Sequence, residues 1–165
     1  MTLNVALTAK RLGLLRELAP QATRFVALVN PNAVMSDSIV KDVHASVPTL
    51  GVPVEILHAG NSDGDIEAAF ANLSQKPGAA LLVTVDPFLF TRRALIVTLA
   101  ARHALPTVYF RREFADIGGL VSYGTSGDFI HGLVRLKRST AEMVKALDRR
   151  PEARRPYRRL CARAA

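Results

Sequence analysis

The stretch Arg24-Phe25-Val26-Ala27-Leu28-Val29 is a short apolar run that ends directly at Asn30-Pro31-Asn32. An apolar run of this length, closed by residues that favour turns, is typical of a strand buried inside a sheet. Three more runs of this kind follow it, and their starts lie about 27 residues apart. The four predicted strands are Arg24–Val29, Val52–Leu57, Ala79–Val85 and Pro106–Phe110.

Segments with helical spacing separate these strands. The clearest follows Ser62 or Asp63, either of which can cap it, and its apolar residues recur at positions i, i+3, i+4 and i+7 of one helix face. These residues are Ile66, Ala69, Phe70 and Leu73. Other helices are expected from about Thr8 to Pro20, from about Ser36 to a stop at Pro48, and from a Thr91 cap to His103. A fifth short strand, Gly119–Tyr123, follows a Gly118-Gly119 turn.

This alternation of helices and strands predicts an α/β fold. A doubly wound, open parallel sheet would lie between two layers of helices, in a Rossmann- or flavodoxin-like α/β/α sandwich. The common strand order 2-1-3-4-5 places a reversal of direction between strands 1 and 3, and ligands bind beyond the carboxyl ends of the strands at that switch point. The loops after strands 1, 3 and 4 should therefore line one rim, formed by residues 30–32, 86–88 and 110–113.

The composition fits one globular domain. The 165 residues are 49% hydrophobic and 22% charged, and no apolar run approaches the roughly 20 residues that a membrane helix needs. The single cysteine, Cys161, excludes a disulfide within the chain and a cysteine-rich zinc site. Residues 1–8 lack the positive segment and apolar stretch of a secretory signal, so the chain as written is expected to stay in the cytoplasm.

The basic charge lies at one end of the sequence. The net charge is +8, but residues 1–126 hold 11 Lys and Arg against 10 Asp and Glu, whereas residues 127–165 hold 11 against 4. We therefore treat residues 1–126 as the folded body and residues 127–165 as a basic tail, helical or partly disordered. Solvated charge runs at chain ends are commoner than dedicated polyanion sites, so nucleic acid is not expected as a partner.

The sequence has no motif for catalysis, for a cofactor or for a metal. Neither a G-x-G-x-x-G turn nor a G-x-x-x-x-G-K-[ST] loop follows the first strand, and Gly124–Asp128 is not a G-x-S-x-G elbow. The four histidines lie on separate elements without metal-ligand spacing. They are His44, His58, His103 and His131. We expect no enzymatic activity, no catalytic residue, no cofactor and no metal.

The rim instead carries amide, carboxylate and aromatic side chains. Amides and carboxylates can fix the polar groups of a small ligand, while aromatic rings cover its apolar surface. The candidate ligand-binding residues are Asn30, Asn32, Asp86, Phe88, Phe110 and Glu113. The alternative is that Asn30-Pro31 and Asp86-Pro87 only end their strands, because Asn, Asp and Pro favour turns for local reasons.

Six motifs lie in order along the chain: TAKRLGLLRELAP (8–20), VALVNPN (26–32), DPF (86–88), AARHALP (100–106), REF (112–114) and GGLVSYGTS (118–126). In combination they closely resemble the solute-binding proteins of ABC transporters in the family related to tryptophan and tyrosine uptake. The resemblance covers about residues 3–126 and corresponds to the carboxyl-side lobe of such a protein. Residues 127–165 depart from the family, and a truncated gene with a shifted reading frame would explain their different composition.

The resemblance implies a receptor in the periplasm or on a lipid anchor. Its two α/β lobes, of the type I periplasmic-binding-protein kind, would close over a small ligand such as an amino acid and deliver it to an ABC permease. One lobe offers only half of the contacts of such a cleft, so we expect weak ligand binding unless two copies associate as a homo-oligomer.

Two other functions remain open. A flavodoxin-like fold also serves nucleotide-responsive regulators and enzymes, although these need a phosphate loop or paired acids, and strand 1 ends at Asn30. The basic tail, as a helix from Phe129 to Arg150, could instead bind a polyanion or another protein. Deleting residues 127–165 would abolish binding by the tail and would spare binding by a receptor lobe.

Overall fold

The computed structural model describes residues 3–126 and 129–134, which form alternating helices and strands. The helices are α1 (Leu3–Leu18), α2 (Ser36–Leu50), α3 (Asp63–Gln75), α4 (Pro87–Thr91), α5 (Arg93–Arg102) and α6 (Arg112–Asp116). The strands are β1 (Arg24–Val29), β2 (Val54–His58), β3 (Ala79–Val83), β4 (Thr107–Tyr109), β5 (Val121–Ser126) and β6 (Phe129–Val134). Within these ranges, no helix has both the length and the apolar character that crossing a membrane requires.

The described strands form one sheet in the order β2-β1-β3-β4-β5-β6. The first five are parallel, and β6 pairs antiparallel with β5. The predicted α/β class and the predicted order 2-1-3-4-5 are therefore confirmed. Because β1 lies between β2 and β3, the winding direction reverses there, and the switch point lies at the carboxyl ends of β1 and β3.

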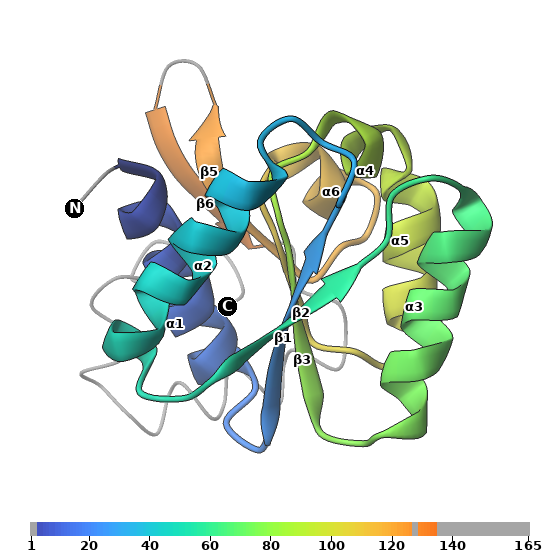
Figure 1. The fold of residues 1–165 in the computed structure, drawn as a ribbon, viewed down its shortest axis with the longest axis horizontal. Coiled ribbons are helices and arrows are strands. Elements are labelled where there is room, and N and C mark those ends of the chain that lie inside the picture. The colour runs from blue at the N-terminus through green and yellow to red at the C-terminus, as the bar shows by residue number, and fades with distance from the viewer. Residues whose placement is uncertain (1–2, 127–128, 135–165) are drawn as a thin grey trace.

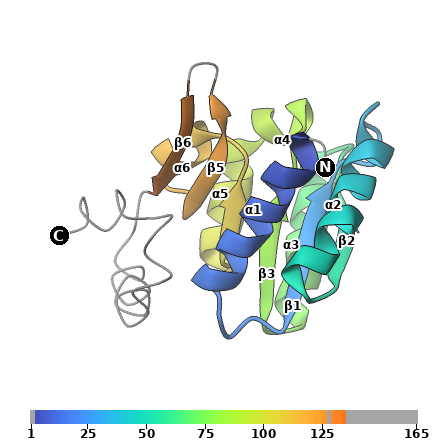
Figure 2. The same ribbon diagram turned by 90° about the vertical axis from the view of Figure 1, so that its left-hand side faces the viewer.

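Helices cover both faces of the sheet and make three layers. Helices α1 and α2 lie on one face, and α3 and α5 lie on the other (Figures 1 and 2). Neighbouring residues of a strand point to opposite faces, so Val26 and Leu28 pack in the α3/α5 core while Ala27 and Val29 pack in the α1/α2 core. This double burial explains why β1 is apolar throughout instead of alternating with polar residues.

The helix boundaries differ from the expectation at three points. Helix α1 begins at Leu3 and not near Thr8. Thr91 is not a cap: Asp86 caps α4 through its side chain, and α5 starts separately at Arg93. Pro48 does not stop α2, since it lies in the last turn and Gly51, in the left-handed region at φ 74°, closes the helix by donating its N–H to the Val47 oxygen.

Residues 129–134 of the basic tail form a strand. The helix expected from Phe129 is wrong over residues 129–134, because these residues form β6 and pair with β5 from Ser126↔Phe129 to Val121↔Val134. Two residues, Gly127 and Asp128, separate the strands in the sequence, and this spacing is typical of a β-hairpin. Residues 135–165, which carry most of the tail's charge, lie outside the described residues. The division of the chain into a body and a separate tail stays a prediction.

Gly124 lets β5 lie against the chain that leaves β4. A Cβ atom at position 124 would overlap the backbone oxygen of Phe110 and would lie 3.4 Å from Nη2 of Arg11 in α1. Any side chain at this position must therefore push β5 away from the backbone of Phe110.

We expect Gly124→Ala to lower the free energy of unfolding by about 1–3 kcal/mol, because the added methyl group overpacks a closed site. The matched control is Gly13→Ala in α1, where an added Cβ meets no atom within 4 Å. That change should raise the free energy of unfolding by about 0.5–1 kcal/mol through helix propensity. Urea unfolding of both variants measures the difference, and a Gly124→Ala protein as stable as the parent would contradict the close approach.

Candidate functional site

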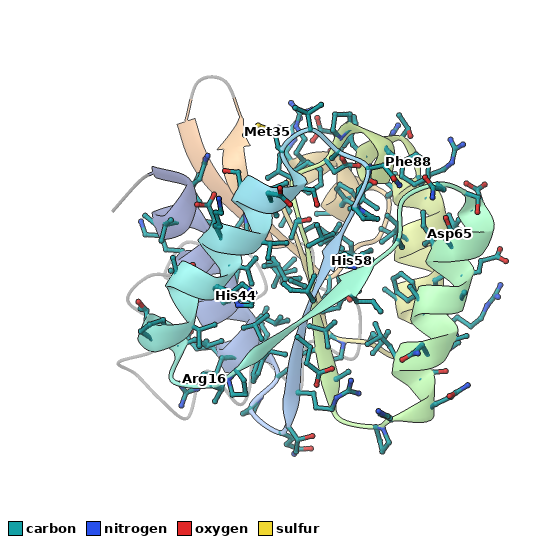
Figure 3. The ribbon with its side chains drawn as sticks, in the orientation of Figure 1. Arg16, Met35, His44, His58, Asp65 and Phe88 are labelled. Atoms are coloured by element: carbon teal, nitrogen blue, oxygen red, sulfur yellow. The ribbon has the colours of Figure 1, made fainter. Side chains whose placement is uncertain are left out.

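A cavity of about 640 Å³ opens at the switch point, beyond the carboxyl ends of β1 and β3. The first half of α1, the β1–α2 loop, the first turns of α2 and the β3–α4 loop form its walls. Of the predicted site residues, Asn30, Asn32, Asp86 and Phe88 line it. Figure 3 shows Met35, at the start of α2, and Phe88, in the first turn of α4, at the same end of the molecule.

A buried amide–carboxylate pair connects the two strands that end at the cavity. The Asn30 Nδ2 group donates a hydrogen bond of 3.1 Å to Oδ2 of Asp86, while Asp86 Oδ1 accepts the N–H of Leu89 at 2.8 Å. Asn30 is 7% exposed and Asp86 is 2% exposed. Asp86 therefore caps α4 with one carboxylate oxygen and holds the Asn30 side chain with the other. Both contacts are structural, and they stabilise the wall of the cavity.

Asn30 also organises its own loop and the loop after β2. Its Oδ1 atom accepts the backbone N–H of Asn32 at 3.0 Å, and Asn32 Nδ2 donates to Oδ1 of Asn61 at 2.5 Å. A Cβ at Gly60 would overlap the Asn30 amide, so only glycine lets the β2–α3 loop lie this close. The polar network thus ties together the loops that follow β1, β2 and β3.

Apolar side chains surround this polar network. Val34, Met35 and Val85 line the cavity and are 101%, 55% and 51% exposed. Phe88 is half-buried, and the guanidinium carbon of Arg92 lies 5.4 Å from the centre of its ring. Exposed apolar residues grouped around a hollow are typical of a surface that a ligand or another protein surface covers.

The structure does not bring Phe110 and Glu113 to the cavity. Phe110 is 6% exposed and packs against Phe90 and Phe114, with ring centres 6.3 Å and 5.3 Å apart. It belongs to the α3/α5 core, whereas the cavity lies on the side of α1 and α2. Glu113 is half-buried on the short helix α6, away from the cavity lining. The rim therefore draws on the loops after strands 1 and 3 but not on the loop after strand 4.

Arg11 lines the cavity, and the sequence analysis did not select it. Its side chain is 6% exposed, and Nε donates to the backbone oxygen of Tyr123 at 2.6 Å. Burial lowers the pKa of Arg11 to about 10, so the guanidinium is still charged at neutral pH. The sequence could have indicated that Arg11 is buried, because Arg11 lies at i, with Leu15 and Leu18 at i+4 and i+7, on the apolar face of a helix.

Within residues 3–126 and 129–134, no three His, Cys, Asp or Glu side chains come together in a way that could hold a metal ion. The polar groups of the cavity are amides, two carboxylates, hydroxyls and one guanidinium. Such groups can bind a small polar molecule by hydrogen bonds and charge.

No protein-family model matches the chain, and no curated protein matches it in sequence. Solved structures do resemble it. An ABC domain from Streptococcus pneumonia in complex with L-Trp has a TM-score of 0.64 at 19% identity, over 73% of this chain and 41% of that one. A ligand-free, open substrate binding protein with adhesive properties from Clostridium difficile has a TM-score of 0.63 at 16% identity, over 84% of this chain and 54% of that one.

A LacI family transcriptional regulator from Bifidobacterium animalis is also similar, with a TM-score of 0.52 at 14% identity, over 71% of this chain and 47% of that one. The chain therefore spans about half or less of the length of these proteins. Identities this low show a shared fold, and the chain has the α/β fold of periplasmic-binding-protein-like domains.

We expect Asp86→Ala to lower the free energy of unfolding by about 1–3 kcal/mol, because it removes a helix cap and leaves the buried Asn30 amide without its acceptor. The matched control, Glu67→Ala, removes an exposed carboxylate from the surface of α3 and should change stability by less than about 0.5 kcal/mol. Chemical denaturation of the two variants gives the comparison. Equal effects would contradict the structural role of Asp86.

Proposed function

We propose that this chain is a ligand-binding lobe of a solute-binding protein that serves an ABC transporter. The observation that carries the proposal is the cavity at the switch point, where polar groups of the β1–α2 and β3–α4 loops converge beside exposed apolar side chains. In doubly wound sheets ligands bind beyond the carboxyl ends of the strands at such a point. The proposal includes no catalytic activity.

The ligand we propose is a small polar molecule of about the size of an amino acid. A cavity of about 640 Å³ lies within the range of pockets for small molecules. Asn32 is exposed at the mouth and would bind a polar group, and the half-buried Phe88 ring would cover an apolar one. The similar domain from Streptococcus pneumonia was solved with L-Trp, which agrees with a ligand of this class.

The proposed ligand needs cover from a second surface. The chain spans 41% and 54% of the two binding proteins described above, so each of them has a second part of comparable size. Val34, Met35 and Val85 would lie against that second surface, whether it comes from another lobe or from a second copy of this chain. In the proposed transport role the closed receptor, located in the periplasm, would deliver its ligand to the permease.

Thermal unfolding of the 165-residue protein with each amino acid, and with other small metabolites, tests the proposal. A compound that binds only the folded state raises stability by RT ln(1 + [L]/Kd), about 2.7 kcal/mol at 100 times Kd. Asn32→Ala should weaken binding of the stabilising compound roughly tenfold, because one hydrogen bond at the cavity is lost. Asn72→Ala, the same change on the exposed surface of α3, is the matched control and should leave binding unchanged.

A cooperatively unfolding sample that no compound stabilises at millimolar concentration would contradict the proposed function. Equal binding by Asn32→Ala and the parent protein would place the ligand elsewhere on the chain. Loss of binding in Asn72→Ala as well would indicate a general loss of structure and would count against the site.

A further inference from the structure

Two Arg-Arg pairs come together near the carboxyl end of the sheet, outside the switch-point cavity. Arg92 lies between α4 and α5, and Arg93 begins α5. Arg111 precedes α6, and Arg112 begins it. Helices α4 and α6 lie at the same end of the molecule (Figures 1 and 2), and none of the four arginines lines the cavity. We call these four residues the arginine cluster.

The ring of Phe90 in α4 holds two of these arginines in place. The guanidinium carbon of Arg93 lies 5.0 Å from the ring centre, and that of Arg111 lies 4.9 Å from it. A guanidinium at such a distance is attracted to the face of an aromatic ring. The half-buried Phe90 ring is itself fixed, because it packs against the buried rings of Phe110 and Phe114, whose centres lie 6.3 Å and 6.1 Å away. Two cations therefore share one rigid support.

Arg93 and Arg111 have no acidic partner in the described part of the chain. Within residues 3–126 and 129–134, no Asp or Glu oxygen lies within 4 Å of their guanidinium nitrogens. Nη1 of Arg93 donates to the Phe90 oxygen at 3.2 Å, and the Arg111 side chain donates to no other described residue. Stacking uses the face of a guanidinium and leaves the N–H groups at its edge, so most of these donors can bind a further acceptor.

The other charges of the arginine cluster do not neutralise these two cations. Its two remaining arginines already have carboxylate partners, Asp63 and Asp116. Glu113, the other acidic residue of α6, is half-buried and forms no ion pair with a described residue. These three carboxylates against four arginines leave the cluster positive. An anion that bridges the two unpaired guanidiniums would relieve the repulsion between them.

A phosphate group fits two such guanidiniums in charge and in geometry. Arginine binds phosphate oxygens through two parallel N–H···O bonds, and a guanidinium that is stacked on a ring is pre-organised for these contacts. A phosphate monoester carries close to two negative charges at neutral pH, because its second pKa is near 6. Two unpaired cations match this charge, whereas a carboxylate or a phosphate diester offers a single negative charge.

We propose that Arg93 and Arg111 form a binding site for a phosphate monoester group, with the Phe90 ring holding both guanidiniums in position. The site is separate from the switch-point cavity and goes beyond the proposed solute-binding function. A terminal phosphate of this kind occurs on small soluble compounds and on the headgroup of phosphatidic acid, and the test separates these two sources.

The first measurement follows the ¹⁵Nε–¹H NMR signals of Arg93 and Arg111 in the intact protein during titration with methyl phosphate. Sodium chloride keeps the ionic strength constant, and each signal is assigned by its loss in the corresponding Lys variant. Methyl phosphate should shift both signals saturably up to about 50 mM, a concentration that fills roughly nine-tenths of a site with a Kd near 5 mM. The signal of Arg102, exposed in the last turn of α5, is the internal control and should not shift saturably.

The charge of the ligand gives two further checks of the same signals. Dimethyl phosphate carries one negative charge and should shift them much less than methyl phosphate does. Binding of methyl phosphate should also weaken as the pH falls from about 7.5 to about 5, because the ligand gains a proton near pH 6 while the arginines keep their charge.

The second measurement uses Arg93→Gln and Arg111→Gln, which each remove one charge. Each change should weaken binding of methyl phosphate roughly tenfold, because one charge-assisted contact is lost. Arg102→Gln removes the same charge from the same helix as Arg93 and should leave the affinity unchanged, so it accounts for the general attraction of the other basic residues. Sedimentation with phosphatidylcholine vesicles, with and without phosphatidic acid, tests the lipid source on the same three variants.

The outcomes distinguish the sources and decide the site. Saturable shifts with methyl phosphate that are lost in Arg93→Gln and Arg111→Gln support a site for a soluble compound. Binding to phosphatidic acid vesicles alone, lost in the same two variants, supports the same phosphate site with a lipid as its source. No response to either probe, an equal response to dimethyl phosphate, an equal shift of Arg102, or binding that both variants retain would overturn the site. None of these results depends on the switch-point cavity, so this proposal and the proposed function fail independently.

Discussion

The hydrogen bond from the Asn30 amide to the Asp86 carboxylate joins the carboxyl ends of β1 and β3, and the rest of the site depends on it. The sheet holds the two strands together as far as Leu28↔Val83, and beyond that pair the side chains must hold the two loops in place. Asp86 makes this connection while it caps α4, and Asn30 extends it to Asn32 and onward to Asn61. The cavity lies against this network, whose buried members have little freedom to move because each of their polar groups needs its partner.

The sequence predicted the fold well because its signals are local. Strands buried on both faces are continuous apolar runs, and the reversal between β1 and β3 follows from the common strand order for such sheets. The errors arise where a contact between residues far apart in the sequence decides which element forms or where it ends. The sequence predicts a Thr91 cap for the helix that ends at His103, but Thr91 lies in the last turn of α4, which Asp86 caps through the Leu89 N–H, and α5 starts at Arg93 without a side-chain cap. Phe129–Val134 carries apolar residues that suit a helix or a strand, and pairing with β5 makes it a strand.

The site was only partly predictable for the same reason. Asn30, Asn32, Asp86 and Phe88 follow strands that end at the cavity, so their place could be read from the order of the elements. Phe110 follows β4, and its ring turns to the opposite face, which an unaligned sequence does not reveal. Arg11 comes from a helix that precedes the sheet, and only the packing of α1 across β3, β4 and β5 brings its charge to the cavity.

A second cavity of about 620 Å³ lies at the opposite edge, where turn residues including Pro20, Pro77 and Pro106 line it. The two cavities are similar in size, so size alone does not show which of them binds a ligand. The polar network around Asn30 and Asp86 lies only at the first cavity and favours it as the binding site. The most direct measurement maps the backbone ¹H–¹⁵N shifts caused by a stabilising compound. The account predicts shifts at Asn30, Asn32 and Ser38, with none at Gly78, His103 and Leu105. Shifts confined to the second group would contradict it.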